Sequence, residues 1–185
     1  MKRLAAILLL SCFALARVHA EMLGREVEVI AAPGWESVAP LPPGQPLPPY
    51  PVLKFVPKDG RNAAVHLSLV PANVPGYEVT DLPSLKGFNL VASRPYLPGP
   101  DARPPVTELK VHDGIGVAIT SEDPALIGKA PPPGEYKIAT TVSLLLGGKT
   151  LVHCIVFYDE KDSADFQEAM QLILSAATKA PSPTI

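Results

Sequence analysis

Runs of apolar residues separated by turn signals divide most of the chain into strands. Residues 27–30 alternate between apolar and polar and end before Pro33-Gly34, and residues 52–56 and 63–70 flank an Asp59-Gly60 pair. This pattern predicts a short strand followed by a β-hairpin, because Asp-Gly supplies the backbone conformation that a two-residue hairpin turn requires.

The second half of the chain repeats the hairpin pattern twice. Residues 106–111 and 115–120 flank an Asp-Gly pair, and the longest apolar runs, 136–146 and 149–158, flank a Gly-Gly pair. Short turns of this kind join antiparallel neighbours. The chain is therefore predicted to contain about seven strands in a mostly antiparallel sheet.

Two segments have the residue spacing of helices. The first begins at Thr80 or Asp81, and the second begins at Asp162 or Ser163 and runs to about residue 177, since all four residues can cap a helix. The residues at helical spacing are Leu82, Leu85, Asn89 and Ala92 in the first, and Phe166, Ala169, Met170, Ile173 and Leu174 in the second. The predicted fold class is α+β, an antiparallel sheet of about seven strands packed with one internal and one C-terminal helix.

Proline-rich loops interrupt these elements and carry aromatic and basic residues. Stiff loops lose little conformational entropy on docking, and aromatic residues and arginines are enriched in interfaces. We therefore predict partner binding by the loops at 31–51 and 94–105, through Trp35, Tyr50, Tyr96, Arg94 and Arg103. Packing of Trp35 over a sheet edge is an alternative interpretation. The hairpin at 136–158 and the last helix are so apolar that we expect them to be core, with little surface for a partner.

The first twenty residues have the pattern of a signal peptide. Lys2 and Arg3 precede a mostly apolar stretch, and residues 18–20 have the small-x-small pattern of a cleavage site, which predicts cleavage after Ala20 and a periplasmic or secreted protein. A lipoprotein anchored through Cys12 is the alternative. No other apolar stretch is long enough for a transmembrane helix. We expect residues 21–180 to form one domain and residues 181–185 a disordered tail.

Cleavage changes the charge balance of the chain. It leaves 13 basic and 18 acidic residues, a net charge of −5 with histidine neutral. This balance argues against a nucleic-acid partner, which requires clustered lysine and arginine. Cys154 is then the one remaining cysteine, so the domain has no internal disulfide.

His153 and Cys154 are adjacent in a predicted strand, where successive side chains point to opposite faces. The two cannot form a catalytic pair or share a metal unless the strand bulges. We interpret Cys154 as a buried hydrophobic residue and His153 as part of the core. A metal site would need His66, His112 and His153 to converge in space, so no metal or other cofactor is predicted.

Catalytic patterns are weak in this sequence. It contains no Gly-x-Ser-x-Gly motif and no glycine-rich phosphate loop. The acids Asp159, Glu160, Asp162 and Asp165 lie at the start of the last helix, where they complement the helix dipole. We therefore predict no catalytic residues.

The order of the predicted elements resembles that of PsbP-like domains. The resemblance rests on the strand and Pro-Gly-Trp of VEVIAAPGWESV, on the closing hairpin GEYKIATTVSLLLGGKTLVHCIVFYDEKD, and on the helix SADFQEAMQLILSAA, and it covers most of residues 25–178. It implies a non-catalytic binding, assembly or accessory module of a lumenal or periplasmic space. The proline-rich insert at 40–51 departs from the pattern. No metal-binding residue is carried over.

These observations together predict an exported, non-catalytic binding or assembly accessory domain. Its partner is predicted to be another protein or a small ligand in the cell envelope. A periplasmic metal-handling protein is the first alternative, and a small hydrolase is the second.

Overall fold

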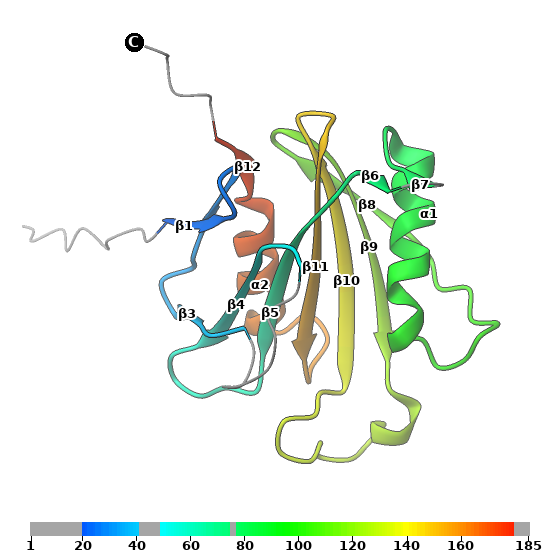
Figure 1. The fold of residues 1–185 in the computed structure, drawn as a ribbon. Helices are drawn as coiled ribbons and strands as arrows, with labels where there is room; N and C mark the ends of the chain where they lie inside the picture. Colours follow the sequence, from blue (N-terminus) through cyan, green and yellow to red (C-terminus); the bar gives the residue numbers. More distant parts are fainter. Residues whose placement is uncertain (1–19, 41–48, 75–76, 180–185) are drawn as a thin grey trace, which may run out of the picture.

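A computed structural model of the chain describes residues 20–40, 49–74 and 77–179, and in these ranges the fold is α+β. A seven-stranded antiparallel sheet forms its centre, with strand order β3-β4-β5-β11-β10-β9-β8 (Figure 1). The predicted fold class is confirmed. The strands of this sheet are β3 (Trp35–Val38), β4 (Val52–Pro57), β5 (Ala64–Val70), β8 (Thr107–Val111), β9 (Gly114–Glu122), β10 (Ile138–Leu146) and β11 (Thr150–Tyr158).

A smaller sheet and a short ribbon complete the strands. The small sheet has the order β1-β2-β12, formed by β1 (Ala20–Leu23), β2 (Val27–Ile30) and β12 (Ala177–Thr178). The ribbon pairs β6 (Asn73–Val74) with β7 (Tyr77–Glu78). The sequence pattern predicted β2, but it missed these other short strands and also β3.

The C-terminal helix is shorter than predicted. α2 (Ala164–Leu174) begins at the N-cap Ser163, whose hydroxyl accepts from the Phe166 amide. The helix ends before residue 177 because the chain there joins the small sheet. The Ser175 hydroxyl donates to the Ile30 carbonyl, and Ala177 pairs with Glu28. The Lys179 amide donates to the Glu26 carbonyl, so the chain is held beside the small sheet up to this residue. The predicted tail at 181–185 lies outside the described residues.

The internal helix α1 (Leu82–Ser93) begins as the sequence indicates. Asp81 is its N-cap and forms a reciprocal capping box with Ser84. The helix ends at Ser93, and its C-cap Arg94 keeps helical backbone angles. Pro95 lacks the N–H group that a further turn of α-helix would need. The chain then makes one turn of 3-10 helix, η1 (Arg94–Tyr96).

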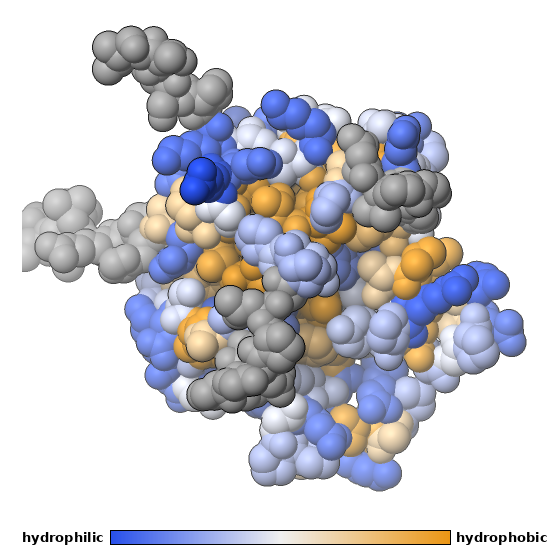
Figure 2. Space-filling view, in the orientation of Figure 1, coloured by the Kyte–Doolittle hydropathy of each residue, from blue (hydrophilic) through white to orange (hydrophobic). Residues whose placement is uncertain are grey.

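The two helices lie on opposite sides of the large sheet (Figure 1). α1 packs on β9 and β10, and its Leu85 shares a buried cluster with Val117 and Leu145. α2 and the small sheet cover the other side, where the larger part of the core lies. Hydrophobic residues also gather at the surface in the middle of the view, over β4, β5 and β11, with hydrophilic residues around them (Figure 2).

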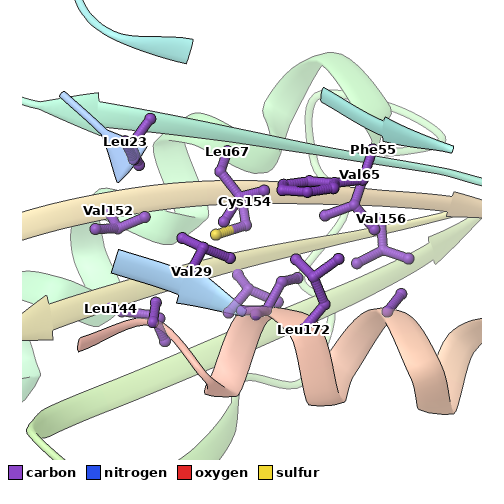
Figure 3. Packing of buried hydrophobic residues seen from close by; sticks show 14 of the residues in the cluster. Leu23, Val29, Phe55, Val65, Leu67, Leu144, Val152, Cys154, Val156 and Leu172 are labelled. Carbon is purple, nitrogen blue, oxygen red and sulfur yellow. The ribbon is translucent and has the colours of Figure 1, made fainter. Parts of the chain in front are cut away.

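β11 shows the predicted alternation of side chains. Val152, Cys154 and Val156 point into the larger core beside α2, where the Cys154 side chain is fully buried (Figure 3). His153 points to the other side and contacts Phe88 of α1 edge to face. One face of this strand therefore packs toward α2, and the other packs toward α1.

Candidate functional site

Helix α1 covers only part of its side of the large sheet. Its buried Asn89 lies over the middle of β10, where the side-chain amide donates to the Thr141 carbonyl over 3.3 Å. The helix then stops at Ser93. The sheet continues for one more row of side chains on this face, beyond the end of the helix.

Three residues on neighbouring strands form this uncovered row. Ser121 of β9 is paired with Ala139 of β10, and Ala139 is paired with Phe157 of β11. Each lies an even number of residues from a member of the α1-side cluster, so all three point to the α1 side. Because the middle side chain is only a methyl group, the row has a hollow at its centre.

This hollow is the floor of a pocket of about 510 Å³. Small-molecule sites in proteins commonly have volumes of roughly 300–1,000 Å³. One wall is the chain that follows α1, and the other is the loop between β9 and β10. The lining comprises Pro95, Tyr96, Leu97, Pro98, Ser121, Asp123, Pro124, Leu126, Glu135, Tyr136, Lys137, Ala139 and Phe157.

Aromatic rings form the most ordered part of the lining. Phe157 stacks on Tyr136 with ring centroids 5.2 Å apart, and it meets Tyr96 edge to face at 5.7 Å. His66 of β5 also contacts Phe157 edge to face, at 5.6 Å. Burial raises the pKa of the Tyr96 and Tyr136 hydroxyls, so both stay protonated at neutral pH. The cluster offers a neutral, ring-lined surface.

Ser121 gives the floor its polar group. Its side chain is 9% exposed, and its hydroxyl is the one buried side-chain polar atom within the described residues that has no hydrogen-bond partner. Buried hydroxyls nearby are satisfied, since Thr140 bonds Tyr158 over 2.9 Å and Ser143 donates to Asn89 over 2.8 Å. Leaving a buried hydroxyl unpaired costs about 1–3 kcal/mol. A water molecule or a polar ligand atom in the pocket could satisfy it.

Charged side chains stand at the rim. Asp123 and Glu135 are exposed lining residues, and Lys137 is half-buried. The base of the loop is closed by the Asp123 amide, which donates to the Lys137 carbonyl over 2.8 Å. The Asp123 carboxylate also accepts from the Ala125 amide and so caps the short 3-10 helix η2 (Pro124–Leu126). Two acids and one base give the rim a net negative charge.

The structure does not gather the five predicted partner-binding residues into one site. Tyr96 lines the pocket at the end of α1, with Arg94 exposed in the same turn. Tyr50 is 40% exposed and lines a separate hollow beside Met22. Arg103 is exposed and bonds carbonyls of its own loop. Most of the proline-rich segment at 40–51 lies outside the described residues.

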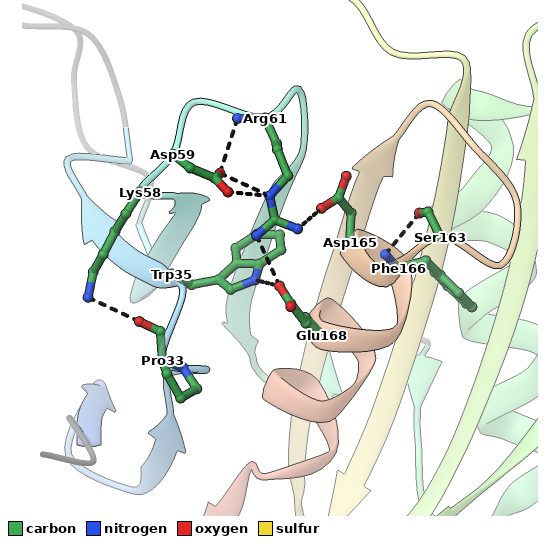
Figure 4. A network of polar contacts seen from close by, with 9 residues as sticks. All are labelled: Pro33, Trp35, Lys58, Asp59, Arg61, Ser163, Asp165, Phe166 and Glu168. Carbon is green, nitrogen blue, oxygen red and sulfur yellow. Dashed lines mark hydrogen bonds and ion pairs between the residues drawn. The ribbon is translucent and has the colours of Figure 1, made fainter. Parts of the chain in front are cut away.

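Trp35 belongs to the core rather than to the surface. Its side chain is 1% exposed, so it is not accessible to a partner, and packing on the sheet is the interpretation that fits this burial. Its indole nitrogen donates to the Glu168 carboxylate of α2 over 2.9 Å (Figure 4). Arg61 reaches the same carboxylate and also pairs with Asp59 and Asp165. These contacts fasten the β4–β5 turn and β3 to the last helix.

The three histidines within the described residues lie in different surroundings. His112 is exposed beside the β8–β9 turn, His66 lies beside Phe157, and His153 lies beneath α1. Within the part of the chain that the structure describes, no group of three or more His, Cys, Asp or Glu residues is placed to hold a metal ion. In those same ranges, no helix is long and apolar enough to cross a membrane.

One serine–histidine contact occurs beneath α1. The Ser143 hydroxyl lies 3.2 Å from His153 Nδ1 and donates to Asn89 over 2.8 Å. Ser143 and Asn89 are fully buried, and burial lowers the pKa of His153 to about 4. A substrate has no direct access to this hydroxyl. The contact joins β10 to β11 within the core, and the bond from Ser143 to Asn89 joins the sheet to α1.

Sequence reasoning missed most of the pocket. Tyr136 and Phe157 were expected to be core, with little surface to offer, and this expectation is wrong at both residues because they line an open hollow. Ser121 was missed entirely. The available signal covered two of the three strands, since the turn at 147–148 aligns Ala139 with Phe157. The pairing of Ser121 with Ala139 spans the long loop between β9 and β10, so no turn signal indicates it.

Comparisons with known proteins identify no family for this chain. No protein-family model matches the chain, and no curated protein matches it. It is similar to a crystal structure from Bacteroides thetaiotaomicron VPI-5482, with 12% sequence identity and a TM-score of 0.49. The similarity covers 86% of this chain and 50% of that chain, so this chain spans half the length of that protein.

Proposed function

We propose that this protein is an exported, non-catalytic binding or assembly accessory domain, and that it binds a small ligand in the pocket at the end of α1. The observation that carries the proposal is the unpaired Ser121 hydroxyl in a ring-lined hollow of ligand size. A pocket that combines apolar walls with a few convergent polar groups is the usual form of a ligand site.

The lining also explains how binding would be specific. Tyr96 comes from the turn after α1, Tyr136 from the loop before β10, and Phe157 from β11, and their ring contacts fix them relative to one another. A wall whose rings are already packed loses little conformational entropy when a ligand docks. A protein partner in the cell envelope could add contacts through the exposed Arg94 and Arg103 loops.

Export rests on residues 1–20, of which 1–19 lie outside the described residues. The charged start, the apolar stretch and the small-x-small boundary support cleavage after Ala20. The intact mass of exported protein tests this, and we expect a chain beginning at Glu21. A chain beginning at a lipidated Cys12 would contradict it. That the chain belongs to the PsbP-like family stays a prediction, which is based on the resemblance in sequence alone.

Ligand retention tests the binding site. The mature protein is incubated with small-molecule extract of the compartment it enters, separated by gel filtration and denatured, and released compounds are identified by mass spectrometry. Ala139→Leu places a larger side chain in the hollow and should abolish retention. Ala130→Leu, at an exposed position of the β9–β10 loop outside the lining, is the matched control. Equal retention by both variants would refute the site.

A further inference from the structure

We infer that the ligand of this pocket is a ring compound that bears a hydroxyl or carbonyl oxygen and whose remaining part is neutral or positively charged. The inference rests on the proposed function and adds the chemical class of the ligand. Three features of the lining support it: the packed rings, the unpaired hydroxyl and the rim charge.

The rings favour a flat ligand. Phe157 already engages Tyr136 in a stacked arrangement and Tyr96 edge to face. Aromatic rings have negative faces and positive edges, so a further ring gains by joining such a cluster in an offset or edge-on position. A flexible alkyl chain would bury similar area without this orientation. Ala139 lies beside Phe157 in the same row, and its small side chain leaves space there. A ligand ring in this space would lie beside the Phe157 ring.

The floor favours an oxygen on that ring. Ser121 lies in the same row on the far side of Ala139, and its hydroxyl can both donate and accept a hydrogen bond. A ligand ring over Ala139 with an oxygen substituent that points toward β9 would form a hydrogen bond with the Ser121 hydroxyl. A plain hydrocarbon ring would bury the hydroxyl further and leave it unpaired, which disfavours that ligand.

The rim disfavours a negative charge at the other end. Asp123 and Glu135 are both exposed at the mouth, against the single cation of Lys137. An anionic group would meet net repulsion there, and a cation would meet attraction. Because the rim is solvated, this effect is smaller than that of the hydroxyl, about two- to fivefold in affinity.

Three small probes separate these contributions. Tyramine carries a phenolic ring and a cation, phenethylamine lacks the hydroxyl, and 4-hydroxyphenylacetate replaces the cation with an anion. Each is titrated into the mature protein at up to millimolar concentration, and the amide NMR shifts of Ser121, Ala139 and Phe157 report binding. We expect tyramine to bind about tenfold more tightly than phenethylamine and about two- to fivefold more tightly than 4-hydroxyphenylacetate.

Two variants assign the preferences to residues. Ser121→Ala should bind tyramine and phenethylamine equally while its unfolding midpoint stays at least as high as that of the unmodified protein. The double variant Asp123→Asn/Glu135→Gln should keep the hydroxyl preference and lose the preference for the cation. A Ser121→Ala protein that still prefers tyramine would overturn the role of this hydroxyl.

The outcomes distinguish failure of this inference from failure of the proposed function. Equal binding of the three probes, or tightest binding of 4-hydroxyphenylacetate, would overturn the ligand class while the pocket remains a binding site. If the protein retains a compound without a ring from the extract, the proposed ligand class is likewise overturned. Absence of any shift at the three floor residues, together with no retention from extract, would overturn both.

Discussion

Trp35 and Glu168, 133 positions apart in the sequence, are joined by a hydrogen bond of 2.9 Å from the indole nitrogen to the carboxylate. The same oxygen lies 3.2 Å from the Arg61 guanidinium. The fully buried indole is thus held by a charged partner at the edge of the core. This contact gives the Pro-Gly-Trp segment a structural role, since it fixes β3 against the last helix.

Replacing the indole should therefore reduce stability. Trp35→Phe keeps an aromatic ring but removes the N–H group and some buried volume, and we expect the free energy of unfolding to fall by about 1–3 kcal/mol. Trp35→Ala should lower it by about 3–5 kcal/mol. Urea denaturation measures both. Tyr50→Ala, at a 40% exposed aromatic residue, should change it by less than about 0.5 kcal/mol. An unchanged urea midpoint for Trp35→Phe would contradict this account.

His153 should make the fold less stable in mild acid. Burial lowers its pKa to about 4 from the ordinary 6.5. Between these pH values the ring is neutral in the folded protein and protonated in the unfolded chain, so the unfolded state binds more protons. The free energy of unfolding therefore falls as the pH drops from 6.5 to 4, by at most about 3 kcal/mol. Burial and nearby Lys54 lower the pKa of His66, which acts in the same direction.

The substitution His153→Gln tests this assignment. Glutamine does not titrate, so the slope of stability against pH in this window should become shallower, with the remainder due to other groups such as His66. His112→Gln, at an exposed histidine beside the β8–β9 turn, controls for histidine replacement as such. Unfolding free energies measured at half-unit pH steps give the slopes. Identical slopes for the unmodified protein and His153→Gln would reject a buried neutral His153.

The thiol of Cys154 should be protected in the folded protein. It is fully buried among Val152, Val156 and Leu67, and burial raises its pKa (Figure 3). Labelling with a thiol reagent should be slow in the native state and fast in urea. Cys154→Ala should lower the unfolding free energy by about 1 kcal/mol, and Cys154→Ser by more, because the serine hydroxyl would need a partner in the apolar core. Rapid labelling of native protein would contradict the burial.

The sequence predicts the long elements of this fold because their signals are local. The glycine-containing turns at 59–60, 113–114 and 147–148 define hairpins, and Asp81 and Ser163 cap the helices as expected. β3 and β12 have four residues or fewer, and partners elsewhere in the chain stabilise them. Local propensity is therefore weak for them. The end of α2 was misplaced for the same reason, since Ala177 pairs with a strand 149 positions earlier.

The pocket required information of a different kind. Tyr96 was found because it lies in a proline-rich loop, but Tyr136 and Phe157 belong to apolar runs that are indistinguishable from core by pattern alone. Their exposure depends on where α1 ends relative to the sheet. Ser121 has no distinctive neighbours in sequence, and its significance is visible only when its hydroxyl is found unpaired beside Ala139.

The attachment of α1 above this pocket should depend on one buried amide. Asn89 is fully buried, donates to the Thr141 carbonyl and accepts from the Ser143 hydroxyl. Asn89→Ala leaves both sheet groups without this partner, and we expect the unfolding free energy to fall by about 2–3 kcal/mol. Lys86→Ala on the same helix removes only a surface ion pair with Glu108 and should cost less than about 1 kcal/mol.

A double-mutant cycle separates this interaction from the loss of packing. Ser143→Ala should cost about 1–2 kcal/mol, because it leaves the Asn89 carbonyl oxygen unpaired. The double variant should cost at least 0.5 kcal/mol less than the sum of the single changes, roughly the size expected for residues in direct contact. Strictly additive free energies from urea denaturation would show that the two side chains act independently. In that case apolar packing around Leu85 would hold α1, and the pocket wall that follows it, against the sheet.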